Sequence, residues 1–142
     1  MSEPLMKLHY VVDGTDFTVA GEASGAVKKV LKQLGLSTEV IRKVAIAMYE
    51  CEINMVIHAN GGVIDVEISP DKIRMIHKDV GPGIPDIDKA MTEGFSTASQ
   101  QVRELGFGAG MGLPNMRKYT DEMNIETEIG VGTTVDMIVY IK

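Results

Sequence analysis

The sequence predicts an α+β fold: a two-layer sandwich in which helices cover one face of a mixed, mainly antiparallel sheet. Two observations lead to this prediction. Segments with apolar residues at every second position indicate strands, and segments with apolar residues at every third or fourth position indicate helices. These segments follow one another as two strands, two helices, two strands, two helices and two strands, an order that suggests a sheet with its helices on one side.

Turn and cap residues set the expected boundaries. Gly35 ends the first helix, the pair Gly61-Gly62 ends the second, and Pro70-Asp71 joins the two central strands. The expected elements are strands at Lys7–Val12 and Phe17–Ala20, helices at Ala23–Leu34 and from a cap at Ser37 or Thr38 to about Ala59, strands at Val63–Ser69 and Ile73–Val80, helices at Asp86–Met91 and Leu113–Met123, and strands at Asn124–Ile129 and Thr133–Ile141.

Length and composition exclude several classes of protein. A chain of 142 residues is expected to form one domain, residues 1–142, and 44% hydrophobic residues are typical of a globular protein. The net charge of −6 argues against binding nucleic acid through its phosphates, and no apolar run is long enough to span a bilayer. The start lacks the pattern of a signal peptide, and the single cysteine, Cys51, cannot form an internal disulfide. These features predict a cytoplasmic protein without a membrane segment.

The long second helix carries the first candidate site. Glu50, Asn54 and His58 are spaced by four residues and share one helical face, whereas Glu52 points elsewhere. The helix is otherwise apolar nearly all round, so it is expected to be buried, and a buried carboxylate or amide needs a partner. One interpretation makes Glu50 a general base and Asn54 an oxygen ligand to Mg²⁺. The alternative is that the helix merely exposes two polar residues. His58 is interpreted as a structural hydrogen-bonding residue.

A second candidate lies where the strand at Ile73–Val80 ends. Asp79 has the same parity as the apolar residues of that strand, and Gly81 and Gly83 let the backbone turn and approach a flat ligand. The carboxylate can accept a hydrogen bond from an exocyclic amine such as that of adenine. An ordinary turn at a strand end is the alternative. His77 stands where an aliphatic residue is expected, and the sequence offers no reason for it.

The segment Thr92–Gly112 is rich in Gly, Ser and Thr and is predicted to be a functional or mobile loop. Its four alternating glycines precede a predicted helix, a combination that favours phosphate, although a flexible linker has the same composition. Arg103 could reach a γ-phosphate, or could simply be solvated. Thr133 shares the inward parity of the last strand. Its hydroxyl is either a nucleotide contact or a residue chosen for β-propensity.

Taken together, four short patterns resemble the N, G1, G2 and G3 boxes of the GHKL ATPases, whereas no Walker-type Gly-Lys-Ser/Thr occurs. The patterns are Glu50–Asn54, Asp79–Gly83, Gly106–Gly112 and Gly130–Thr134. Within that group, the small size and the segments Ala90–Thr97, Gly112–Lys118 and Asp121–Met123 resemble the bacterial anti-sigma-factor serine/threonine kinases. The segment His58–Gly61 and the residue His77 depart from the usual pattern.

The resemblance implies an ATP site, with Mg²⁺, between the sheet and the helices. It implies Glu50 as the catalytic base, Asn54 as the magnesium ligand and Asp79 as the adenine reader. The remaining residues assigned to the nucleotide site are Gly81, Gly83, Arg103, Gly108, Gly110, Met111, Gly112, Leu113 and Thr133.

The resemblance also implies partners. The expected substrate is a Ser or Thr on a STAS-domain anti-anti-sigma protein, with a sigma factor as a second partner and a homodimer as a candidate assembly. Two functions therefore stay open. One is an ATP-dependent protein kinase. The other is a binding module, in which ATP orders a surface that captures a sigma factor or scaffold protein without turnover.

Overall fold

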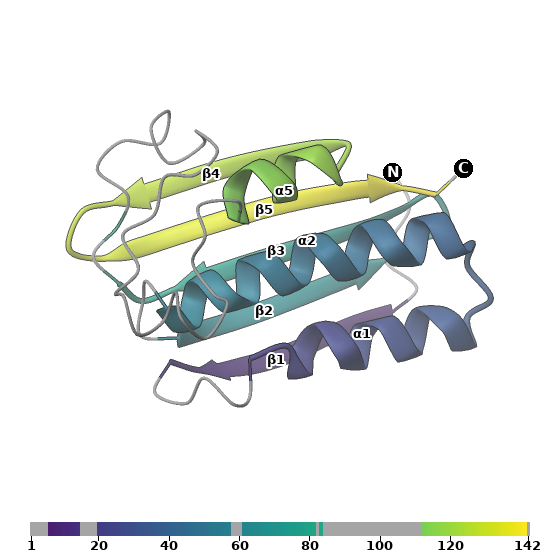
Figure 1. Cartoon of the computed structure of the whole chain (residues 1–142), viewed down its shortest axis with the longest axis horizontal. Helices are drawn as coiled ribbons and strands as arrows, with labels where there is room; N and C mark the ends of the chain where they lie inside the picture. Colours follow the sequence, from purple (N-terminus) through teal and green to yellow (C-terminus); the bar gives the residue numbers. More distant parts are fainter. Residues whose placement is uncertain (1–5, 15–19, 58–60, 82, 84–111, 142) are drawn as a thin grey trace.

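The computed structural model describes residues 6–14, 20–57, 61–81, 83 and 112–141 of the chain. Figure 1 shows the helices lying against one face of a twisted sheet. The elements are β1 (Met6–Asp13), α1 (Glu22–Gln33), α2 (Thr38–Ile57), β2 (Gly61–Ile68), β3 (Lys72–Asp79), α5 (Gly112–Lys118), β4 (Glu122–Glu128) and β5 (Gly132–Tyr140).

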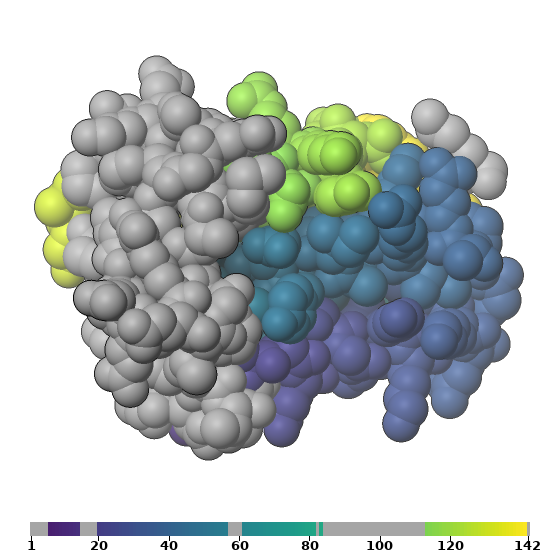
Figure 2. Space-filling view, in the orientation of Figure 1, coloured from purple at the N-terminus to yellow at the C-terminus, as the bar shows by residue number. Residues whose placement is uncertain are grey.

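Within the described part of the chain, the sheet has five strands in the order β1-β2-β3-β5-β4. Each neighbouring pair among the described strands is antiparallel, so these strands supply no parallel component of the mixed sheet that was expected. On the covered face α2 lies between α1 and α5, as Figure 2 shows. The predicted α+β architecture with helices on one face is confirmed.

The core lies between the sheet and the helices. One row of directly paired residues crosses the whole sheet on the covered face and consists of Tyr10, Ile64, His77, Val135 and Ile125. Along β3 and β5 every second residue is buried, which confirms the alternation read from the sequence. Burial of these apolar side chains is the main favourable contribution to folding.

The start of α2 and the end of α1 agree with their predicted cap residues. The backbone N–H of Val40 donates to Ser37 Oγ over 3.2 Å, so Ser37 is the N-cap of α2. Gly35, with a φ of 76°, follows the end of α1 in the left-handed conformation that glycine adopts most easily. None of the described helices combines the length and hydropathy that a bilayer-spanning segment requires.

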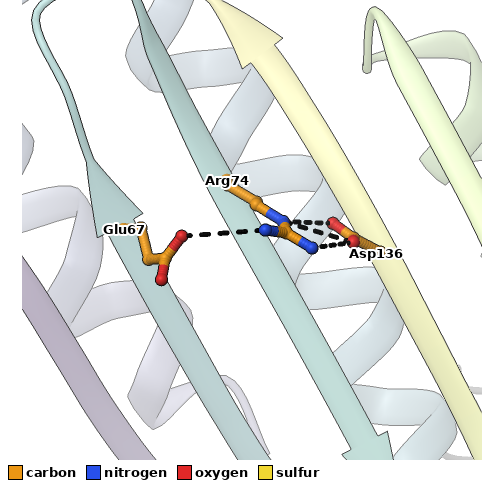
Figure 3. Close-up of polar contacts among 3 residues, drawn as sticks. All are labelled: Glu67, Arg74 and Asp136. Carbon is orange, nitrogen blue, oxygen red and sulfur yellow. Dashed lines mark hydrogen bonds and ion pairs between the residues drawn. The ribbon is translucent and has the colours of Figure 1, made fainter. Parts of the chain in front are cut away.

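The opposite face of the sheet is polar. Arg74 on β3 lies between Asp136 of β5 and Glu67 of β2 (Figure 3). The Arg74 Nε–H donates to Asp136 Oδ1 over 3.0 Å, and Nη1 is 3.9 Å from Glu67 Oε1. Such partly exposed pairs add little stability, but they favour this register of the three strands.

The helix predicted over Leu113–Met123 is too long. α5 ends at Lys118, where the Thr120 hydroxyl donates to the carbonyl of Met116 over 2.8 Å. The N–H of Asp121 already donates to the carbonyl of Ile138, so the chain has joined the sheet. Met123 therefore belongs to the inward face of β4, and its helical spacing was fortuitous. The predicted strand over residues 17–20 and the predicted helix over 86–91 fall wholly or mostly outside the described residues.

Candidate functional site

Three elements meet at one end of the molecule. Figure 1 shows the C-terminal end of α2, the end of β3 and the start of β5 at the same end of the sheet. Asp79 on β3 pairs with Gly62 on β2, and a Cβ on Gly62 would lie 2.9 Å from the Met55 methyl carbon. The last turns of α2 therefore pack directly over the row that contains Asp79.

Glu50 lies on the side of α2 that faces α5. Burial raises the pKa of the Glu50 carboxyl above its ordinary value, and the polar side chain of Asn115, on α5, opposes part of this rise by lowering the pKa. A half-buried carboxylate with a raised pKa is a stronger base than an exposed one, as proton abstraction requires.

Asn54 lies one helical turn beyond Glu50 and is also partly buried. The described residues contain no group of three or more His, Cys, Asp or Glu side chains that could hold a metal ion. The Asn54 carboxamide oxygen is a hard ligand that fits Mg²⁺, which commonly takes its remaining ligands from phosphate and water. The donor set is thus suited to a magnesium ion that arrives with a nucleotide.

Asp79 is held by the last strand. Its Oδ1 accepts a hydrogen bond of 2.8 Å from the backbone N–H of Thr133. Burial raises the pKa of the Asp79 carboxyl, while this hydrogen bond lowers it. Since the bond engages Oδ1, the oxygen Oδ2 is the one suited to accept from a ligand. The Thr133 side chain is buried, as its parity predicted, and its hydroxyl lies 2.9 Å from that of Thr127.

Glycines at this end allow backbones to pack closely. A Cβ on Gly132 would lie 2.3 Å from the carbonyl oxygen of Asp79, so only glycine brings β5 this near to the end of β3. Gly83, with a φ of 81°, packs its backbone against Glu128 and Ile129 in the same way. The N–H of Gly81 donates to the carbonyl of Val131. The described contacts of Gly81 and Gly83 are therefore with the β4–β5 hairpin, and their contact with a ligand stays a prediction.

Glu52, two residues from Glu50, has a structural role that the sequence analysis missed. Its side chain is only 2% exposed, and its two oxygens accept hydrogen bonds of 2.9, 3.2 and 3.0 Å from the backbone N–H groups of Gly21, Ala23 and Ser24. Gly21 has no side chain with which to cap α1, so Glu52 caps it from α2. A helix start without its own capping residue was the signal available in the sequence.

Cys51 is buried in α2 and stands between Glu50 and Glu52 in the sequence. Burial raises the pKa of its thiol well above the ordinary value, and the negative charges of Asp79 and Glu52 raise it further. The thiol is therefore un-ionised and behaves as a small apolar side chain in the core.

His77 occupies the inward face of β3 and is 1% exposed. Neither ring nitrogen has a hydrogen-bond partner among the described residues. Burial lowers the pKa of His77 to about 3, so the imidazole is neutral at physiological pH. The structure confirms that this position faces the core, but it does not explain the choice of histidine.

The remaining predicted site residues divide into two sets. Gly112 is the first residue of α5, and Leu113 is buried in the core cluster, so the described contacts of Leu113 are packing contacts. Four others lie outside the described residues, and their assignment to the nucleotide site stays a prediction: Arg103, Gly108, Gly110 and Met111. His58, interpreted as a structural hydrogen-bonding residue, also lies outside the described residues.

A shallow cavity of about 430 Å³ lies beside the C-terminal end of α5. It is lined by Arg117, Thr120, Asp121, Glu122 and Met123. Glu122 pairs with Ile138, near the end of β5, whereas the candidate site lies at its start. This cavity is therefore separate from the candidate site.

Comparison with known proteins identifies the family to which this chain belongs. The sequence model of the family of histidine kinase-, DNA gyrase B- and HSP90-like ATPases matches residues 39–142. The chain belongs to this family. The match begins next to the Ser37 cap of α2 and includes every candidate site residue, as the predicted N, G1, G2 and G3 boxes require.

Two kinds of relative within this ATPase family resemble the chain. The serine/threonine-protein kinase RsbT of Bacillus subtilis (strain 168) is 33% identical over 119 residues, which make up 81% of this chain and 84% of RsbT. The anti-sigma F factor of Thermoanaerobacter sp. (strain X514) is 37% identical over 114 residues, 77% of this chain and 76% of that protein. These relatives confirm the predicted GHKL family and the predicted enzyme class, a protein serine/threonine kinase.

Solved structures support the fold. The RsbU and RsbW domains of a Mycobacterium tuberculosis protein superimpose with a TM-score of 0.63 at 16% identity, over 97% of this chain and 32% of that one. The SiaB–SiaC complex of Pseudomonas aeruginosa gives a TM-score of 0.62 at 10% identity, over 96% of this chain and 90% of the matched chain. At these identities the likeness concerns the architecture alone.

Proposed function

We propose that this protein is an ATP-dependent serine/threonine protein kinase of the anti-sigma regulatory class, acting as one domain in the cytoplasm. Its proposed substrate is a Ser or Thr hydroxyl on a STAS-domain partner. The observation that carries the proposal is the position of Glu50. This half-buried carboxylate has a raised pKa. It lies one turn from Asn54 in the C-terminal half of α2, the helix that ends at the same end of the sheet as β3.

The residues present suggest a division of labour. Asp79 accepts a hydrogen bond from the adenine amine through Oδ2, while the Thr133 amide keeps Oδ1 in place. Asn54 holds Mg²⁺, whose charge screens the phosphates when it is bound. Glu50 takes the proton of the acceptor hydroxyl as that oxygen bonds to the γ-phosphorus. The bond from the γ-phosphorus to the bridging oxygen breaks, and ADP leaves.

The decisive experiment incubates the full chain with Mg·ATP and a STAS-domain protein encoded beside its gene. We expect phosphoserine or phosphothreonine on the partner. The transfer should be lost in Glu50→Gln while ATP binding is kept, because the amide cannot take a proton but preserves the shape of the side chain. Transfer that continues in Glu50→Gln would contradict the proposed role of Glu50.

A second candidate is an ATP-dependent module that captures a sigma factor or a scaffold without turnover. Its support is the name anti-sigma F factor carried by relatives up to 37% identical. Tight, ATP-dependent binding of the partner with no phosphate transfer by the wild-type chain would favour this candidate over the kinase.

A further inference from the structure

The charges of this protein are divided unequally between its two layers. The three described helices contain seven Lys and Arg residues and four Glu residues. The five described strands contain four Lys and Arg residues and eight Asp and Glu residues. A chain whose net charge is −6 therefore has a helical layer of the opposite sign.

Five exposed cations of the helical layer have no carboxylate partner. Among the described residues none of the five forms an ion pair, whereas the neighbouring Lys43 pairs with Glu39 over 3.4 Å. Together they form the helical basic patch, which consists of Lys28, Lys29 and Lys32 of α1, Arg42 of α2 and Lys118 of α5. Arg117 does not belong to the patch, because Asp121 and Glu122 line the same shallow cavity.

The ring of Tyr119 brings cations from two helices close together. The guanidinium carbon of Arg42 lies 5.4 Å from the ring centre, and Nζ of Lys118 lies 5.3 Å from it. Like charges repel each other, and no described carboxylate pairs with either of these two cations. An anion that contacts both cations relieves this repulsion, and the ring has already ordered the guanidinium.

The patch lies away from the candidate site. Lys32 is near the end of α1 and Arg42 is near the start of α2, and residues 34–37 join these two helix ends. Figure 1 shows this connection at the end of the molecule opposite to the end of β3. Figure 2 shows the outer surface of α1, α2 and α5 on one side of the molecule. Leu34, in the connection, is 46% exposed.

We propose that the helical basic patch is a docking surface for a partner protein whose own surface is rich in carboxylates. Charge complementarity carries the proposal, because the patch offers several unpaired cations on an otherwise acidic protein. DNA and anionic membranes are extended polyanions, so the acidic remainder of the protein repels them. An acidic protein surface can match the patch alone.

The apolar groups beside the cations also fit a protein partner. Protein interfaces are enriched in aromatic residues and Arg, which Tyr119 and Arg42 supply, and Leu34 adds exposed apolar surface. The proposal does not depend on the proposed kinase activity, since neither the nucleotide nor Glu50 takes part in it.

The test measures the binding of a short polyglutamate peptide to the full chain by NMR titration. The shifts should be largest for amides at the end of α1, the start of α2 and the end of α5. In the double variant Lys32→Glu/Lys118→Glu the peptide should bind about tenfold more weakly, because two attractions become repulsions. Higher salt should weaken binding to the wild-type chain as well.

The double variant Lys7→Glu/Lys78→Glu is the matched control. It makes the same change in net charge at two exposed positions on the opposite face of the sheet. It should alter the dissociation constant by less than about twofold. Equal losses in the two double variants would overturn the proposal, because they would show a general effect of net charge.

Two further outcomes decide the nature of the partner. Tighter binding of duplex DNA, or of phosphatidylcholine vesicles containing phosphatidylserine, than of the peptide would overturn the proposal by assigning the patch to another polyanion. The shifts of the wild-type chain need no substitution, so a misfolded variant does not affect them. No binding of the peptide, or largest shifts in β4, would also overturn the proposal.

Discussion

The two sides of α2 carry carboxylates in contrasting environments. On the side facing α1, Glu52 is buried and its oxygens accept three backbone hydrogen bonds. On the side facing α5, Glu50 is half-buried, and burial raises its pKa against a smaller, opposing effect of the Asn115 side chain. The two carboxylates therefore differ in role. A carboxylate surrounded by backbone donors stabilises a helix start, while one with fewer donors remains available to exchange a proton.

The largest effect is expected from Glu50→Gln. Loss of the base should lower phosphoryl transfer by about 10²- to 10⁴-fold. The free energy of unfolding should change by less than about 0.5 kcal/mol, because the amide keeps the volume and can still meet Asn115. Transfer from labelled ATP and urea unfolding measure the two quantities. Glu126→Gln, at an exposed position on β4, is the matched control. A large loss of stability in Glu50→Gln would remove the contrast between the two glutamates.

In contrast to Glu50→Gln, the substitution Glu52→Ala should strongly lower the stability of the protein. It leaves three N–H groups at the start of α1 without an acceptor and opens a small cavity, so the free energy of unfolding should fall by about 3 kcal/mol. Hydrogen exchange of the Ala23 and Ser24 amides should accelerate more than that of amides in β5. Unchanged exchange at these two amides would show that Glu52 does not cap α1.

His77 should make the stability of the protein vary with pH. This residue lies on the inward face of β3, beneath the helices. Its pKa is lowered to about 3 in the folded protein by burial, against about 6.5 in the unfolded chain. Below pH 6.5 the unfolded chain therefore binds a proton that the folded protein does not, and stability falls as the pH falls. The loss from this residue at pH 5 should be about 2 kcal/mol.

The comparison with His77→Leu isolates this contribution. The half-buried carboxyls of Glu50 and Asp79 have raised pKa values, so they change stability in the opposite direction as the pH falls. They are common to both proteins and cancel in the difference between the two denaturation curves. Parallel pH dependences of the two proteins would show that the pKa of His77 is not lowered in the folded state.

The smallest effect concerns the contact between Arg42 and Tyr119 on the Glu50 side. Arg42→Gln removes one of the two cations near the Tyr119 ring, the other being Lys118 of α5 at 5.3 Å, and should lower the free energy of unfolding by about 0.5 to 1 kcal/mol. Tyr119→Leu in a double-mutant cycle tests whether the two losses share one interaction. Strictly additive losses would mean that this contact does not hold α5 against α2.

Much of the sheet could be predicted because alternation is a local property. The inward parity of Thr133 and Asp79 follows from counting every second residue along one strand, and both side chains have the expected orientation. The end of α5 was missed because Met123 satisfies helical spacing, while its place in β4 depends on pairing with β5. Pairing with β5 overrides the helical spacing of this segment, and periodicity alone contains no information about the strand with which a segment pairs.

The sequence by itself determined the class of fold, the positions of α1 and α2, the four nucleotide-box patterns and the family they indicate. The helix positions follow from spacing within one segment, the fold class from the order of the segments, and the family from a resemblance carried by the four patterns together. Only the tertiary structure decided which glutamate caps α1 and which meets Asn115, and that Gly132 brings β5 against Asp79. These contacts join residues 28 to 65 positions apart. Their partners depend on how helices and strands pack, and packing is a property of the whole chain rather than of any one segment.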